Sequence, residues 1–205
     1  MGRQYGFYID TSRCSGCKAC QAACNDKHDS AAGVLWRRVY EVSGGSWIQE
    51  GNSWKHNILA YNISMACNHC EDPVCAKVCP AKAIFKRKDG IVLIDEKKCI
   101  GCRYCEWACP YGSPQYDHDK GVMSKCTLCY DYIGDGRNPS CVDACPMRVL
   151  EFGEMNDLRK KYGEISEIHP LPDKNLTRPA IVIKPHKDSI RIKESNLKVN
   201  NKEEV

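Results

Sequence analysis

The cysteines of this 205-residue chain fall into four groups of four, and no cysteine lies outside a group. The groups are Cys14-x2-Cys17-x2-Cys20-x3-Cys24, Cys67-x2-Cys70-x4-Cys75-x3-Cys79, Cys99-x2-Cys102-x2-Cys105-x3-Cys109 and Cys126-x2-Cys129-x11-Cys141-x3-Cys145. A cubic [4Fe–4S] cluster takes one thiolate at each of its irons. The sixteen cysteines therefore divide evenly into ligands for four such clusters.

The spacing within the groups favours iron–sulfur chemistry. Three cysteines at intervals of three residues can hold three corners of one cube, and a fourth cysteine, four residues later, reaches a second cluster. The third group, closed by Pro110, has the C-x2-C-x2-C-x3-C-P pattern of bacterial two-cluster ferredoxins. Pro80 and Pro146 close the second and fourth groups, whereas Asn25 stands at this place in the first.

Two other uses of cysteine fit the sequence less well. Disulfide scaffolds are typical of short secreted chains, and residues 1–8 contain no apolar segment of a signal peptide. Structural zinc also binds four cysteines from C-x2-C pairs, but the first and third groups have three close cysteines and a displaced fourth. Only the fourth group fits zinc when taken alone, so a zinc-stabilised binding module is the alternative of another class.

The charge balance points to bound anions rather than to nucleic acid. The formal net charge is +4. An oxidised cluster with its four thiolates carries about −2, so four clusters add roughly −8 and bring the loaded chain to about −4. We interpret the basic residues inside or beside the groups as compensation for cluster charge, with ordinary solvated charges as the alternative. These residues are Lys18, Lys77, Lys82, Lys98, Arg103 and Lys125. No nucleic-acid partner is expected.

An internal repeat divides the groups into two kinds. Residues 7–17 and 92–102 each indicate a short strand, an Asp turn and a Cys-x-Gly-Cys loop. Residues 72–80 and 138–146 share a proline before the third cysteine and another after the fourth. The alternating order predicts two two-cluster domains. Asp89-Gly90 between two apolar runs signals a hairpin that favours joining groups two and three, although groups three and four are also close in sequence.

The segments outside the groups give weaker expectations. Residues 25–66 carry three tryptophans and indicate irregular strands that cover a cluster or face a partner, with core packing as the alternative. A helix is predicted over 154–162, followed by a proline-broken extended stretch over 169–185. The last twenty residues are predicted to be disordered, or ordered only on a partner. His69 is interpreted as a surface residue, and no apolar run is long enough for a direct membrane span.

Several stretches of the chain resemble the iron–sulfur subunits of anaerobic dimethyl sulfoxide reductases. The matching stretches include Cys67-Asn-His-Cys-Glu-Asp-Pro-Val-Cys75, Cys99-Ile-Gly-Cys-Arg-Tyr-Cys105 and Ala108-Cys-Pro-Tyr-Gly112. The resemblance extends from Gln4 to Pro185. The cysteine pattern is shared by the wider family of four-cluster, ferredoxin-type subunits of molybdopterin oxidoreductases. That family also serves polysulfide, thiosulfate, tetrathionate, nitrite, nitrate and formate enzymes.

The resemblance implies an α+β fold with four [4Fe–4S] clusters in two bacterial-ferredoxin-like domains with insertions. The first domain would comprise residues 1–60 and 119–165, the second residues 61–118, and an extended C-terminal tail for subunit docking residues 166–205. The implied ligands are Cys14, Cys17, Cys20 and Cys145 for cluster one and Cys24, Cys126, Cys129 and Cys141 for cluster two. They are Cys67, Cys70, Cys75 and Cys109 for cluster three and Cys79, Cys99, Cys102 and Cys105 for cluster four.

The resemblance also implies a role in electron transfer without a catalytic site, and the sequence contains no P-loop, dinucleotide-binding or nucleophile–base motif. In the implied heterotrimer, a membrane anchor oxidises menaquinol, and a molybdopterin catalytic subunit reduces dimethyl sulfoxide or similar S- or N-oxides in anaerobic respiration. This chain conducts electrons between them. It would be a peripheral subunit without its own signal peptide, held at the membrane by the anchor and exported with a twin-arginine catalytic partner.

Overall fold

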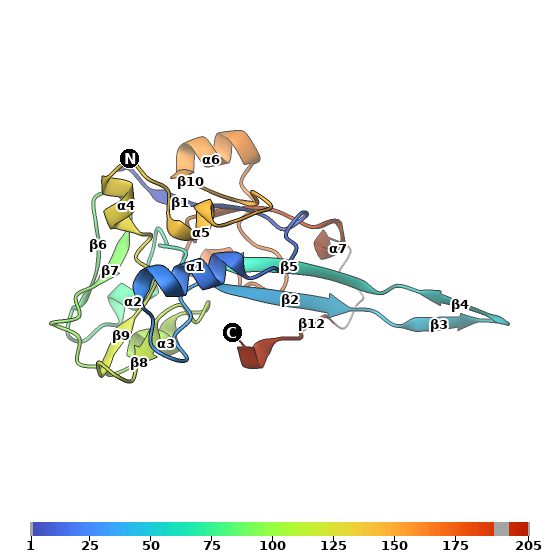
Figure 1. Cartoon of the computed structure of the whole chain (residues 1–205), viewed down its shortest axis with the longest axis horizontal. Helices are drawn as coiled ribbons and strands as arrows, with labels where there is room; N and C mark the ends of the chain where they lie inside the picture. Colours follow the sequence, from blue (N-terminus) through green and yellow to red (C-terminus); the bar gives the residue numbers. More distant parts are fainter. Residues whose placement is uncertain (1, 191–196, 205) are drawn as a thin grey trace.

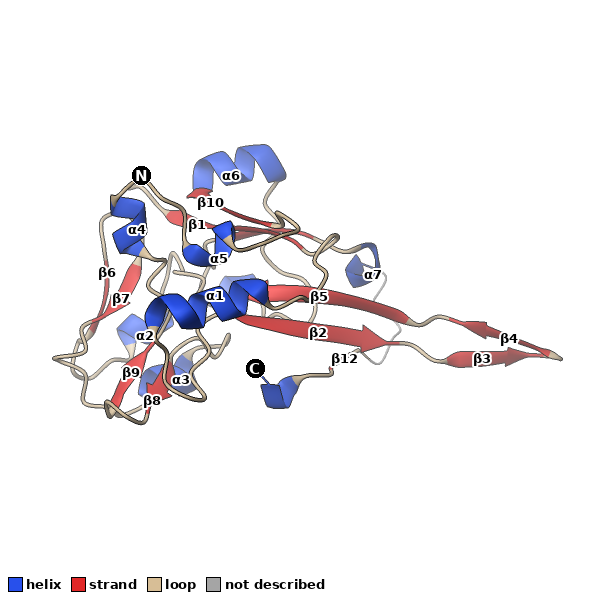
Figure 2. Ribbon diagram, viewed as in Figure 1, coloured by secondary structure: helices blue, strands red, loops and turns tan. Residues whose placement is uncertain are grey.

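The strand that precedes the first cysteine group forms the middle of a three-stranded sheet. In the computed structural model, which describes residues 2–190 and 197–204, β1 (Tyr5–Asp10) pairs antiparallel with β10 (Leu150–Glu154) and parallel with β11 (Ile181–Lys184). The first three residues of β11 are buried, as are nearly all of those of β1. The apolar run that the sequence indicates only as extended is therefore a core strand of the α+β fold shown in Figures 1 and 2.

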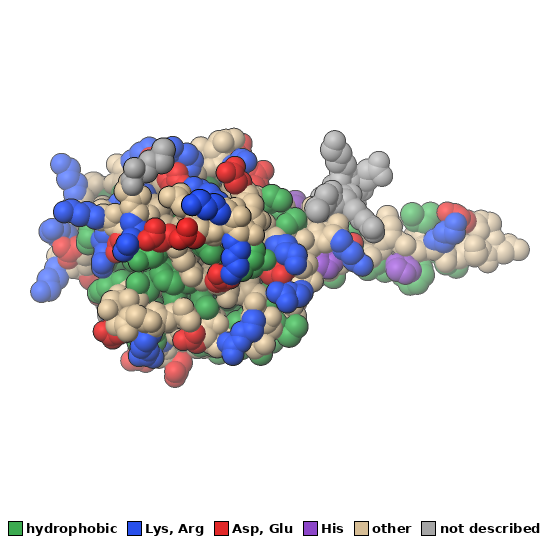
Figure 3. Space-filling model, turned by 90° about the horizontal axis from the view of Figure 1, so that it is seen from above, with side chains coloured by type: hydrophobic (Ala, Val, Ile, Leu, Met, Phe, Trp, Pro, Cys, Tyr) green, Lys and Arg blue, Asp and Glu red, His purple; other side chains and the backbone are tan. Residues whose placement is uncertain are grey.

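The segment between the first two cysteine groups is a long β-ribbon. β2 (Arg38–Gly44) and β5 (Leu59–Met65) pair along their whole length, and β3 (Trp47–Glu50) and β4 (Ser53–His56) continue the ribbon beyond a short break. Its far end projects from the body in Figures 1 and 3. Trp47 and Trp54 lie on this end and are 59% and 60% exposed, whereas Trp36 is partly buried. Strands are thus present as predicted, and core packing applies only to Trp36.

The second and third cysteine groups are linked by short ribbons. β6 (Ile84–Lys86) and β7 (Val92–Ile94) form the hairpin predicted around Asp89-Gly90. β8 (Gln115–Asp117) and β9 (Val122–Ser124) form another. A small core of Ile84, Val92 and Met123, with Cys75 and Cys105, lies between them.

Proline sets the length of the cysteine-bearing helices. α2 (Val74–Lys77), α3 (Tyr104–Ala108) and α5 (Ser140–Asp143) each end just before a Cys-Pro pair. Proline lacks the amide hydrogen and disfavours helical backbone in the residue before it. α1 (Ala19–His28), in which Asn25 follows Cys24, continues for ten residues.

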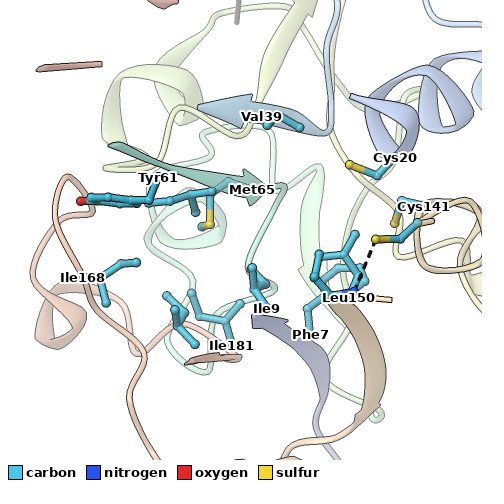
Figure 4. Packing of buried hydrophobic residues seen from close by; sticks show 14 of the residues in the cluster. Phe7, Ile9, Cys20, Val39, Tyr61, Met65, Cys141, Leu150, Ile168 and Ile181 are labelled. Atoms are coloured by element: carbon cyan, nitrogen blue, oxygen red, sulfur yellow. Dashed lines mark hydrogen bonds between the residues drawn. The ribbon is translucent and has the colours of Figure 1, made fainter. Parts of the chain in front are cut away.

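The main core joins the three-stranded sheet to the base of the ribbon. Phe7 and Ile9 of β1 pack with Val39 of β2 and Ile63 of β5, and Cys20 and Cys141 lie at one edge of the same core (Figure 4). α6 (Met155–Tyr162) confirms the predicted helix and covers β1 and β11 with Met155 and Leu158. The other short elements are α4 (Tyr130–Gly134), η1 (Lys174–Leu176), α7 (Lys187–Ile190) and η2 (Lys202–Glu204).

The end of the chain packs on the ribbon. β12 (Lys198–Val199) pairs antiparallel with β2. The buried Asn201 donates from Nδ2 to Val39 O at 2.8 Å and accepts at Oδ1 from Glu41 N at 2.9 Å. The prediction of a tail that is disordered or needs a partner to order is wrong for residues 197–204, because these backbone and side-chain hydrogen bonds fix it. The same prediction is wrong for residues 187–190, which form α7, and for residues 191–196 and 205 it lies outside the described residues.

The strand pairing relates the groups in space. β1 precedes group one and β10 follows group four, so their pairing brings these two groups together. The β6–β7 hairpin connects groups two and three. The division into residues 1–60 with 119–165 and residues 61–118 stays a prediction. Within the described ranges, no helix combines the length and apolar character that crossing a membrane requires.

Candidate iron–sulfur centres

All four cysteine groups contain the same backbone turn. The residue before the second cysteine has a positive φ in every group. These residues are Gly16 (72°), His69 (42°), Gly101 (66°) and Leu128 (60°). In groups one and three the next residue but one, Lys18 or Arg103, also has a positive φ and caps the helix that carries the third cysteine. The repeat seen in the sequence is therefore a repeat of backbone geometry.

Three cavities are each lined by four cysteines. The first is lined by Cys14, Cys17, Cys20 and Cys145. The second is lined by Cys67, Cys70, Cys75 and Cys109. The third is lined by Cys79, Cys99, Cys102 and Cys105. In each cavity one cysteine comes from a different group than the other three, as expected when the last cysteine of a group reaches a second cluster.

The remaining four cysteines also come together. Cys24, Cys126, Cys129 and Cys141 are all buried. Burial raises the pKa of Cys24 to about 12, with further contributions from Cys141 and Cys129. Burial likewise raises the pKa of Cys126 well above its usual value, and Cys24 and Cys141 are among its charged neighbours. The structure thus brings together the four sets of cysteines that the resemblance implies, while the binding of one cluster by each set stays a prediction.

The polar groups around these cavities fit an iron–sulfur cluster. Among the side-chain atoms that line the second cavity, Asn68 Nδ2 is buried and has no hydrogen-bond partner within the described residues, while the hydroxyls of Thr177 and Ser113 face the thiols of Cys70 and Cys109. Buried polar groups are almost always paired, and cluster sulfides and thiolates accept hydrogen bonds. All sixteen cysteines are free thiols in the structure, so no disulfide occupies these positions.

Known proteins share this chain's sequence over most of its length. A protein-family profile described as a 4Fe-4S dicluster domain matches residues 59–155. The chain is 53% identical to a chain of the anaerobic dimethyl sulfoxide reductase of Escherichia coli strain K12, over 92% of each. It is 50% identical to the probable anaerobic dimethyl sulfoxide reductase chain YnfG of the same strain, over 100% of each. A subunit of the tetrathionate reductase of Salmonella typhimurium is 34% identical over 81% of this chain and 64% of its own length.

This protein belongs to the family of dimethyl sulfoxide reductase iron–sulfur subunits. Membership in that family confirms the ferredoxin-type α+β fold and selects iron–sulfur over structural zinc. The sixteen cysteines fit four [4Fe–4S] clusters. The chain is an electron-transfer subunit of a reductase and not its catalytic subunit.

The four sets of cysteines follow one another through this iron–sulfur subunit. α1 carries Cys20 of set one and Cys24 of set two. Cys126 of set two packs beside Cys67 of set three. α3 carries Cys105 of set four, and Cys109 of set three follows directly. The second cysteines of groups one and three, Cys17 and Cys102, are exposed. The sets therefore form a row with an exposed cysteine at each end.

The basic residues near the groups are mostly exposed. Lys125 is the exception, because it is only 3% exposed and donates to the carbonyl oxygens of Val92 and Cys126. The other five of the six are exposed or partly exposed, as the solvated-charge alternative expects.

His69 is buried, so the surface interpretation of this residue is wrong. Its Nδ1 accepts the Val92 N–H at 3.0 Å. Burial, together with Lys125, lowers the pKa of His69 well below its usual value. His69 is therefore a neutral residue of the loop that carries Cys67 and Cys70.

Arg37 is a buried basic residue beside the cysteine sets that the sequence did not indicate. It stands one residue before β2 and is 1% exposed. Burial lowers the pKa of Arg37, but Cys141, Cys20 and neighbouring thiolates raise it, so that the net shift is upward. A basic residue outside the cysteine groups gives no sequence signal of this kind, because strand pairing alone brings it to the cysteines.

Proposed function

We propose that this chain conducts electrons from a membrane anchor that oxidises menaquinol to a molybdopterin catalytic subunit that reduces dimethyl sulfoxide or similar S- or N-oxides. The observation that carries the proposal is a row of four four-cysteine sets with an exposed cysteine at each end. When bound, [4Fe–4S] clusters supply one-electron transfer between neighbouring sites. The chain's part is to hold them close together, to insulate the inner sets and to present the outer two.

In this proposal the sixteen cysteines act as iron ligands in the four sets described above. Burial favours the protonated thiol, as for Cys70 and Cys75, whose pKa values burial raises to about 12. Iron binding must therefore release protons. Backbone amides then support the bound sulfurs, since Ala83 N lies 3.3 Å from Cys79 Sγ and Val149 N lies 3.4 Å from Cys145 Sγ.

The two exposed ends suit different partners. At the Cys102 end, Ile100 and Trp107 are 67% and 78% exposed, which is unusual for large apolar side chains. At the Cys17 end, Lys18 pairs with Glu41 at 3.3 Å and with Glu204 at 2.6 Å. We assign the apolar end to the membrane anchor and the charged end to the catalytic subunit. The chain is then a peripheral subunit held by the anchor and exported with a twin-arginine catalytic partner.

Another terminal acceptor is the second candidate. The tetrathionate reductase subunit of Salmonella typhimurium shares 34% identity with this chain, and the same architecture would serve polysulfide, thiosulfate or formate enzymes. The higher identity to two dimethyl sulfoxide reductase chains, 53% and 50%, favours the dimethyl sulfoxide type.

The test is to isolate the complex anaerobically from native membranes through a tag on this chain. We expect a molybdenum-containing subunit and an integral membrane subunit to co-purify, with about sixteen irons per copy of this chain. Dithionite-reduced clusters should be reoxidised by dimethyl sulfoxide. Reoxidation by tetrathionate or polysulfide alone would contradict the assigned acceptor. A colourless preparation rich in zinc would contradict the electron-transfer role itself.

A further inference from the structure

We propose that Arg37 is a buried cation shared by clusters one and two, which raises the reduction potentials of both. The proposal rests on the cysteine sets assigned under the proposed function. Arg37 lies outside the cysteine groups, and it would set the reduction potentials of the two clusters at one end of the row.

Arg37 is only partly hydrogen-bonded. Its Nη1 donates to Ser64 Oγ at 3.0 Å and to Ser64 O at 3.2 Å, and its guanidinium carbon lies 4.6 Å from the centre of the Phe7 ring. Nε and Nη2 are buried and make no complete hydrogen bond within the described residues, and the guanidinium faces the thiol of Cys141. A guanidinium has five N–H donors that seek acceptors, so the free side of Arg37 is available to a bound group.

The electrostatic partners of Arg37 are cysteines from two sets. The guanidinium faces the thiol of Cys141 and the backbone N–H of Arg37 faces that of Cys24, and Cys20 and Cys126 are the other cysteines that attract its charge. Cys20 belongs to set one and the other three belong to set two. An unpaired charge buried this deeply would strongly destabilise the fold. The anions that compensate it are therefore the groups that the two cysteine sets hold.

Ser64 connects Arg37 specifically to set one. Its hydroxyl oxygen accepts from Arg37 and lies 3.1 Å from Cys20 Sγ. With Arg37 as donor to that oxygen, the hydroxyl hydrogen is free to point to the sulfur. Removal of Ser64 Oγ should thus affect set one, whereas removal of the guanidinium should affect both sets.

The sign of the effect follows from charge. Reduction adds a negative charge to a cluster, and a nearby buried cation stabilises the reduced form more than the oxidised form. Neutralising Arg37 must therefore lower the reduction potentials of clusters one and two together. Clusters three and four lie farther along the row, and their potentials should stay unchanged.

The experiment is a redox titration of the purified complex, followed by electron paramagnetic resonance of each cluster. In Arg37→Gln, at a fixed ambient potential, we expect the ratio of reduced to oxidised cluster to fall about tenfold for clusters one and two. This corresponds to a reduction potential lower by about 59 mV for a one-electron couple. Arg37→Lys, which keeps the charge, should restore most of the ratio. Ser64→Ala should lower it for cluster one alone.

Arg38 provides the matched control. It is the next residue, is also buried, and donates through Nη2 to the carbonyl oxygens of Tyr111 and Gly112 at 3.0 and 2.9 Å. Arg38→Gln should leave the potentials of clusters one and two unchanged. Three results would each overturn the proposal. The potentials could stay unchanged in Arg37→Gln at full iron content, all four clusters could shift equally, or Arg37→Lys could lower the potentials as much as Arg37→Gln.

If Arg37→Gln assembles poorly, the iron content of the purified complex provides a second test. The proposal then predicts the loss of about eight of about sixteen irons, those of clusters one and two, with recovery in Arg37→Lys. Equal loss from all four sites in both variants would refute it. These outcomes differ from a failure of the proposed function, which would appear in the unsubstituted complex as missing iron or missing partner subunits.

Discussion

The loops that carry Cys17 and Cys102 share a backbone but not their surroundings. Gly16 and Gly101 have φ values of 72° and 66°, and the capping residues after the second cysteines have φ values of 59° and 61°. Around the first loop lie ion pairs and the end of the chain. Around the second loop lie exposed apolar side chains beside a local ion pair of Arg103 with Glu106. The repeated backbone thus suits the bound cluster, while the neighbouring residues determine what each end can contact.

The two loops also belong to regions with different cores. The first loop follows β1, the central strand of a three-stranded sheet that packs with the ribbon in the main core. The second loop follows β7, one strand of a two-stranded hairpin with a small core in which two of the buried members are cysteines. Small cores need additional crosslinks, so the second region should depend more on its clusters than the first.

Removal of iron should produce the largest difference between the regions. After anaerobic chelation we expect residues 67–118 to exchange amide hydrogens at nearly the rate of an unfolded chain, because metal-binding free energy is folding free energy in such small sites. The sheet β10-β1-β11 should keep measurable protection. Hydrogen exchange with mass spectrometry reports both in one sample. Simultaneous loss of protection in both regions would contradict the comparison.

Alanine substitution of the two equivalent glycines should reduce stability by different amounts in the two loops. A Cβ at Gly101 would lie 2.4 Å from the Gly121 carbonyl oxygen, whereas a Cβ at Gly16 would meet the Asn62 amide at 2.7 Å. A side-chain amide can rotate away, but a backbone carbonyl cannot. We expect Gly101→Ala to cost about 3 kcal/mol and Gly16→Ala about 1–2 kcal/mol, which includes the strain of positive φ in both.

Anaerobic thermal melting of the iron-loaded variants measures this difference. Gly134→Ala is a suitable control, because nothing lies within 4 Å of its added Cβ. Equal melting temperatures for Gly16→Ala and Gly101→Ala would mean that the residues around each loop do not influence the cost of the added Cβ.

The sequence predicted the parts of this fold that local chemistry controls. The Asp89-Gly90 hairpin and the helix that ends before Gly163 follow from turn and capping residues. The grouping of the cysteines into four sets is what the resemblance implies, because spacing alone decides only which cysteines lie on one loop. Family membership confirmed the cofactor.

Long-range contacts could not be predicted from the sequence in the same way. Asn201 fixes the end of the chain by hydrogen bonds to residues 160 and 162 positions away. Arg37 reaches Ser64 only because β2 and β5 pair. Burial of His69 likewise depends on β7, which lies 23 residues away. Such contacts have no local pattern, so the sequence predicts a tail that is disordered or ordered only on a partner, and a histidine at the surface.

Substitutions at the two exposed ends should weaken different interactions. Trp107→Gln should lower the affinity for the anchor about tenfold or more, because large apolar side chains dominate the binding energy of interfaces. The loss should change little with salt. Lys18→Gln should have a smaller effect on binding of the catalytic subunit, and salt should reduce the difference, because exposed charges are screened. Pull-down titrations at two salt concentrations test both. If Trp107→Gln instead weakened the interaction with the catalytic subunit, the assigned ends would be reversed.

The smallest expected effect concerns the end of the chain, which covers the Cys17 side through Glu204 and has no counterpart at Cys102 within the described residues. Asn201→Ala removes two hydrogen bonds to the backbone of β2 and should destabilise the docked state of residues 197–204 by about 1–2 kcal/mol. Amide exchange of these residues should rise about tenfold, with iron content unchanged. Asn200→Ala, which removes an exposed bond to Ser43 Oγ at 2.7 Å, is the matched control and should change exchange much less. Equal effects of the two substitutions would show that β12 pairing, and not the buried amide of Asn201, holds the tail against the first loop.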